Sequence, residues 1–177
     1  MKDNSEAINA LNYLDKNQEE SLNRLIKLLK FPSISTKIEH KKDCINASKW
    51  LGEELASIGF NVEILETSGN PMVVANYKTT GPHYLFYGHY DVQPIDPIEL
   101  WNDDPFQPKV EATASGKILK SRGSSDDKGQ LMTFIEACRA LKETNGKLPC
   151  QITVLLEGEE EIGSPSMKEF LIASVRR

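Results

Sequence analysis

Three turns that carry histidine or acidic residues each follow directly on an apolar run typical of a β-strand. These turns are residues 88–91, 122–129 and 157–164. In open α/β sheets, ligands gather at the carboxyl ends of the strands, where strands pass into loops. One imidazole and several carboxylates at such an edge are suitable donors for zinc or a hard cation, which can activate water for hydrolysis. The sequence therefore predicts a metal-dependent hydrolytic site built from the three turns.

The first turn contains His89 and, two residues later, Asp91. Residues i and i+2 of a strand point the same way, so the carboxylate could hold the imidazole. A metal-bound histidine usually donates its other N–H to a carboxylate. Taken alone, this pattern is more often a core or surface histidine followed by a turn aspartate. The preceding strand and the two acidic turns downstream favour the metal interpretation.

The second turn, Asp126-Asp127-Lys128-Gly129, opens an expected helix. Acidic residues are favoured at helix N-termini by the free N–H groups and the macrodipole, so plain capping would explain one aspartate. The preceding segment 122–125 suggests a tightly folded loop instead. The turn alone leaves capping and metal binding open.

The third turn contains Glu159-Glu160-Glu161 after a run expected to be a buried strand. Adjacent carboxylates repel one another, and burying one without a partner is costly. A solvated acidic loop is one explanation. The other is a nearby dication, for which one glutamate serves as ligand while its neighbour holds the attacking water as general base.

Together the three turns resemble the dinuclear-zinc metallopeptidases that include aminoacylase, acetylornithine deacetylase, succinyl-diaminopimelate desuccinylase and the carnosine-type dipeptidases. The matching motifs are His89-Tyr90-Asp91 with Val92-Gln93-Pro94, the segment from Arg122 to Gly129 with its Asp-x-Lys-Gly ending, and Glu160-Glu161-Ile162-Gly163-Ser164. The segment from Trp101 to Phe106 is most similar to the dipeptidase branch. The resemblance extends from about Phe31 to the end of the chain.

The resemblance implies a role for five residues. His89 would ligate one metal, Asp126 would bridge two divalent metal ions, and Glu161 would ligate the second. Asp91 would orient the first metal site and Glu160 would act as general base. Zinc is the expected metal, with manganese or cobalt as alternatives, and the peptide bond between Asp126 and Asp127 is expected to be cis. Asp127 and Glu159 match no role in the family.

The elements that position these turns follow from hydrophobic periodicity. Apolar residues three and four apart predict amphipathic helices over 22–29 and 47–58, the second capped by Gly59. Strands are expected at 62–65, 72–75, 84–87 and 152–156, with a hairpin formed by 109–112 and 117–120. A helix should begin near Lys128, and a last helix should be capped by Ser164 with Pro165 at its first position. This pattern predicts a three-layer α/β/α domain with a central mixed sheet.

Composition limits the other possibilities. The chain has 177 residues, 27% of them charged, and a net charge of −5, which argues against a nucleic-acid partner. Its N-terminus is polar, no run is long enough to span a membrane, and three scattered cysteines suggest neither a disulfide framework nor a thiolate zinc site. A cytoplasmic protein is expected.

The end of the chain at Arg177 bears on function. The family needs a further aspartate downstream of the third motif, a histidine near its C-terminus and a lid domain that also dimerises, and residues 1–177 contain none of these. We therefore expect the N-terminal part of a catalytic domain, incomplete at its C-terminus, from an enzyme that hydrolyses dipeptides or N-acyl amino acids as a homodimer. With two ligands per metal, this chain alone is expected to bind metal weakly and to be inactive. The alternative is a truncated product that binds at most metal or a partner.

Overall fold

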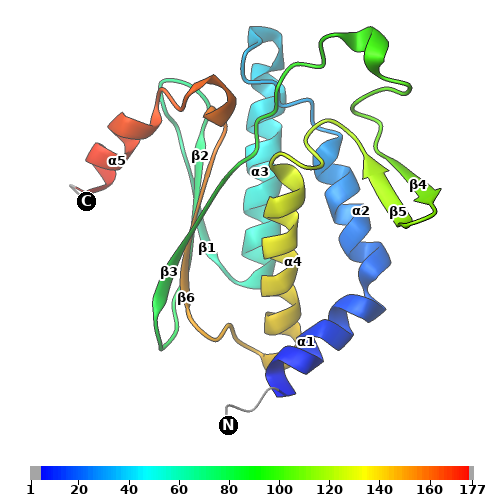
Figure 1. The fold of residues 1–177 in the computed structure, drawn as a ribbon. Coiled ribbons are helices and arrows are strands. Elements are labelled where there is room, and N and C mark those ends of the chain that lie inside the picture. Colours follow the sequence, from blue (N-terminus) through cyan, green and yellow to red (C-terminus); the bar gives the residue numbers. More distant parts are fainter. Residues whose placement is uncertain (1–4, 176–177) are drawn as a thin grey trace.

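The computed structural model describes residues 5–175 and has a mixed α/β architecture (Figure 1). Its α-helices are α1 (Ser5–Lys16), α2 (Gln18–Leu29), α3 (Lys41–Ile58), α4 (Lys128–Asn145) and α5 (Met167–Val175), with short 3₁₀ helices η1 (Ile38–His40), η2 (Ile98–Leu100) and η3 (Glu160–Ile162). Its strands are β1 (Asn61–Leu65), β2 (Met72–Tyr77), β3 (His83–His89), β4 (Lys109–Thr113), β5 (Gly116–Lys120) and β6 (Gln151–Glu157). The predicted α/β class is confirmed.

A four-stranded mixed sheet forms the centre, in the order β1-β2-β6-β3. β1 and β6 are antiparallel to β2, whereas β3 is parallel to β6, with His89 opposite Glu157 at the end of the pair. Because parallel strands end at the same edge, the first and third acidic turns emerge side by side. The second turn, at the start of α4, lies at the same end of the molecule (Figure 1).

Helices α3 and α4 pack on one face of the sheet, and α5 lies on the other side (Figure 1). The core between the sheet and α3 and α4 contains Leu51, Leu55, Leu131, Val154 and Leu156, all fully buried. On the edge strand β3, Phe86 stacks on Phe134 of α4, whereas Leu85 and Tyr87 point the other way and are 66% and 48% exposed. Among residues 5–175, no helix is both long and apolar enough to cross a membrane.

Helices α2, α3 and α4 lie where the periodicity predicted them, and the hairpin β4–β5 forms as expected. Gly59 ends α3 in a left-handed conformation with φ 100°, and its N–H bonds to the carbonyl of Ala56. Only glycine adopts that conformation without a steric cost, which is why the helix ends there.

Two features differ from the sequence-based expectations. α1 was not predicted; only Ala10 of its twelve residues is buried, while Ile8 and Leu11 are exposed. The prediction that Ser164 caps the last helix was wrong, since α5 begins at Met167. Ser164 has a positive φ of 52°, and its hydroxyl donates to the carboxylate of Glu157 at 2.8 Å.

Candidate metal centre

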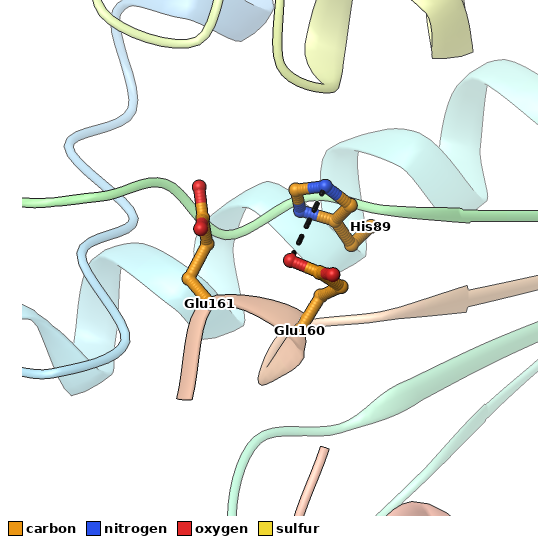
Figure 2. A group of neighbouring side chains, drawn as sticks. All are labelled: His89, Glu160 and Glu161. Carbon is orange, nitrogen blue, oxygen red and sulfur yellow. Dashed lines mark ion pairs between the residues drawn. The ribbon is translucent and has the colours of Figure 1, made fainter. Parts of the chain in front are cut away.

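The structure brings His89 together with acidic side chains from both of the other turns. Its Nε2 lies 3.1 Å from Oδ1 of Asp126 and 3.8 Å from Oε2 of Glu160. Figure 2 shows Glu160 and Glu161 extending from one turn toward the imidazole, and one potential ligand atom from each of these three residues lies within 4.8 Å of the others. Asp126 contacts His89 but does not belong to this group of three.

Asp91 is the buried link between the first and third turns. Its side chain is fully buried, and its two oxygens accept the backbone N–H groups of Glu160 at 3.2 Å and Glu161 at 3.1 Å. Nδ1 of His89 lies 3.2 Å from the Asp91 carbonyl and 3.4 Å from its carboxylate, which leaves Nε2 facing Asp126 and Glu160. Asp91 therefore fixes both the ring and the backbone of the acidic turn. Sequence reasoning had connected it only with the imidazole.

The second turn has the predicted backbone: the peptide bond between Asp126 and Asp127 is cis. Asp127 occupies the N-cap position of α4, but its side chain makes no capping hydrogen bond there. Instead Oδ2 accepts the N–H of His89 at 3.1 Å, so capping does not explain this aspartate. Burial raises the pKa of Asp127 above its ordinary value, and the bond from His89 opposes that shift.

Gln93 is a further residue of the site that the motifs did not single out. Its side-chain amide donates to Oε2 of Glu161 at 2.7 Å and to the Glu161 carbonyl at 3.3 Å. The only sequence signal for it was its place in the Val92-Gln93-Pro94 extension of the first motif. Gln93 holds one oxygen of Glu161 in a defined position.

Lys128 anchors the second turn to α2. It is fully buried, and its amine donates to the carbonyls of Phe31 at 2.7 Å and Leu28 at 3.3 Å, at the end of that helix. Burial lowers the pKa of Lys128 to about 7. The turn that carries Asp126 is thus tied to backbone almost a hundred residues away in the sequence.

The electrostatics of the group suit a cation. Burial alone would lower the pKa of His89, but the hydrogen bond and charge of Asp91, with the charges of Asp127 and Glu160, raise it to about 9. A proton on His89 therefore offsets part of the repulsion among the carboxylates when no metal is bound. One imidazole nitrogen and several carboxylate oxygens are also the donor set that zinc and other divalent metals accept.

We expect metal affinity to rise steeply with pH below about 9. Only the neutral imidazole binds metal, so each ion bound at His89 must displace one proton from the metal-free chain. Cobalt(II) affinity should increase roughly tenfold per pH unit between pH 6.5 and 8.5. Titration in non-coordinating buffers, followed by visible absorption, measures this slope. An affinity that does not change over that range would contradict the assignment of His89 as a ligand.

Gly158 should not tolerate a side chain. A Cβ at this position would lie 2.4 Å from the ring and hydroxyl of Tyr90, which is fully buried and donates to the Pro71 carbonyl at 2.6 Å. Gly158→Ala should lower the free energy of unfolding by about 2–4 kcal/mol, through overpacking and the loss of that bond. Urea denaturation measures the change. Gly158 does not have a positive φ, so its loss of stability would report overpacking, whereas Gly146→Ala, where a Cβ meets nothing within 4 Å, measures the strain of a positive φ without a clash.

Comparison with known proteins agrees with this geometry. The model of peptidase family M20/M25/M40 matches residues 85–176, just over half of the chain. The Cys-Gly metallodipeptidase of Saccharomyces cerevisiae is 27% identical over 173 residues, which cover 89% of this chain and 36% of that protein. The chain thus spans about a third of the length of the curated dipeptidase that it matches.

Solved structures extend the similarity to the fold. Human carnosine dipeptidase 1 superposes with a TM-score of 0.83 at 25% identity, over 92% of this chain and 36% of that one. An M20-family metallo-carboxypeptidase from Sulfolobus solfataricus is 36% identical with a TM-score of 0.73, over 86% of this chain and 33% of that one. With three acidic motifs gathered at one edge of a shared fold, the chain belongs to peptidase family M20/M25/M40.

Proposed function

We propose that this chain is the N-terminal part of a metal-dependent hydrolase of dipeptides or related N-acyl amino acids. The observation that carries the proposal is the group formed by His89 with Asp126, Glu160 and Glu161 where β3 and β6 end. Family membership and the dipeptidase relatives support the reaction class. The peptide as substrate and a homodimeric full-length protein are part of the same proposal.

In the proposed mechanism, His89, Asp126 and Glu161 would hold two divalent metal ions, and Asp126 would be a ligand of both. Bound there, such ions would polarise the scissile carbonyl and lower the pKa of a water molecule. Glu160, whose side chain is 44% exposed, accepts the proton of the attacking water and passes it to the leaving amine. Asp91 keeps Nε2 of His89 directed at Asp126 and Glu160, where a metal would be held, and fixes the backbone of Glu160 and Glu161.

The length of the chain supports the proposal that it is only part of an enzyme. It covers 36% of the yeast dipeptidase and a similar share of the matched structures. Each metal would have two ligands from residues 1–177, whereas catalytic zinc usually has three from protein. We propose that the remaining ligands and a lid belong to the rest of a full-length protein, and that the isolated chain binds metal weakly and does not turn over substrate.

The test compares the isolated chain with the longer protein, if the reading frame continues past Arg177. Both are assayed on dipeptides and N-acyl amino acids with zinc, manganese or cobalt. We expect hydrolysis only by the longer protein, with activity lost to a chelator and restored by metal. A longer protein that binds metal but hydrolyses neither class would contradict the proposal. Failure of the frame to continue would favour the alternative, an inactive product that binds metal or a partner.

A further inference from the structure

A cavity lined by polar and apolar side chains lies beside the third turn, apart from the metal centre. Its volume is 120 Å³, and it is formed by segment 34–41, the start of α3, the loop before β2, and Glu159 of the third turn. The carboxylate of Glu159 lies against the backbone of Gly69, where a Cβ would be 1.6 Å from Oε1. Glu159 has no role in the proposed metal centre.

Three side-chain oxygens from this lining have no hydrogen-bond partner within the described structure. They are Oε2 of Glu159, Oδ1 of Asn70 and Oγ of Ser35. Glu159 and Asn70 are only 4% and 5% exposed. The Asn70 amide nitrogen donates to the Gly158 carbonyl at 2.7 Å, which fixes Oδ1 as the oxygen left over. A buried acceptor without a donor is costly, and a carboxylate more so than a neutral group.

The charges around the cavity are balanced. Lys41 donates to the Gly69 carbonyl, and no carboxylate lies within ion-pair distance of its amine in the described structure. Lys37, the other lysine of the lining, pairs with Asp96 at 3.6 Å. The cavity therefore presents one positive charge, on Lys41, and one negative charge, on Glu159. A simple cation would be repelled by the first charge, and a simple anion by the second.

We propose that this cavity binds a small amino acid in its zwitterionic form. An ammonium group has three N–H donors, which match the three unpartnered oxygens of Glu159, Asn70 and Ser35. The carboxylate of the ligand pairs with Lys41. The volume equals that of roughly four water molecules at about 30 Å³ each, which suits glycine or alanine better than an amino acid with a large side chain.

The cavity is directly connected to the turn that carries the proposed general base, Glu160. Glu159 precedes Glu160, and the Asn70 amide holds the carbonyl of Gly158 on the other side. A bound amino acid would restrain the backbone from which Glu160 extends. The inference does not rest on the proposed function, because binding is measured without metal and without turnover.

The experiment is calorimetric titration of the chain in chelator with glycine, alanine, leucine, acetate or methylammonium at constant ionic strength. We expect saturable binding of glycine and alanine only, with acetate and methylammonium at least about tenfold weaker, because each satisfies one charge. Glu159→Gln and Lys41→Met should each lower the affinity for glycine at least about tenfold. The exposed α3 residues provide matched controls, Glu53→Gln and Lys49→Met, which should bind glycine as the unmodified chain does.

Several results would overturn the inference. One is the absence of saturable glycine binding, which would mean that water alone occupies the cavity. Another is methylammonium or acetate binding as tightly as glycine, which would identify an ion site. Unchanged affinity in Glu159→Gln or Lys41→Met would place the ligand elsewhere. Thermal unfolding shows whether each variant is folded. If Glu159→Gln does not fold, the glycine affinity of Lys41→Met decides whether the ligand binds in this cavity.

Discussion

Glu160→Gln should lower kcat by about 10²–10⁴-fold in the active, full-length enzyme, while leaving the metal in place. The substitution keeps the size of the side chain and removes the group that accepts the proton from water. Glu160 lies 3.8 Å from Nε2 of His89, so a role as ligand competes with a role as base. Steady-state kinetics together with metal analysis of the same preparation distinguish the two roles.

The neighbouring residue provides the matched control. Glu161→Gln alters the proposed ligand one position away and should lower metal affinity, with activity recovering in part at high metal concentration. The 177-residue chain allows the binding half of the test without turnover, by cobalt titration of both variants. If Glu160→Gln loses metal and Glu161→Gln retains it, the two roles are reversed. A Glu160→Gln enzyme with normal kcat would exclude the proposed base.

Asp91→Ala should damage both stability and metal binding in the chain as it stands. It removes the acceptor for the N–H groups of Glu160 and Glu161, in a place where the side chain is fully buried. Two backbone donors left without partners should cost about 2–4 kcal/mol of unfolding free energy. Loss of the group that orients His89 should weaken metal binding by about 10–100-fold.

Urea denaturation and cobalt titration measure these two effects. Asp91→Asn preserves the volume of the side chain but leaves one oxygen for two N–H groups. Its unfolding free energy and its cobalt affinity should therefore lie between those of the original chain and Asp91→Ala. Asp15→Ala, on the exposed side of α1, should change neither quantity. Asp91→Ala with unchanged metal affinity would show that the acidic turn keeps its shape without this carboxylate.

Much of the fold followed from periodicity, because strongly amphipathic segments have one face to bury. α2 and α3 each place apolar residues at three- and four-residue spacing, and both lie against the core. α1 buries only Ala10, and the helix packs against α4, a contact between distant segments that sequence spacing does not reveal. The prediction of an N-cap at Ser164 failed for a similar reason. The hydroxyl of Ser164 donates to the buried Glu157 instead of capping α5, and sequence spacing does not reveal that partner.

The site was predictable to the extent that it lies within the three motifs. The residue types of His89, Asp126 and Glu160 indicated cation chemistry, and the turn after each strand indicated where they would gather. The hydrogen bond from Gln93 to Glu161 and that from His89 to Asp127 join segments far apart in the chain, and glutamine and aspartate are ordinary in loops. Such contacts depend on register and loop path, which neither composition nor spacing records.

The buried amine of Lys128 determines how far the chain can be shortened. Both of its acceptors, the carbonyls of Leu28 and Phe31, precede the segment matched by the family model, which begins at residue 85. An expression fragment trimmed to 85–176 would retain every proposed metal ligand, yet it would lose both carbonyl groups that accept hydrogen bonds from the buried Lys128 amine. Any recombinant boundary, chimera or domain transplant that aims to keep this centre must therefore start upstream of α2.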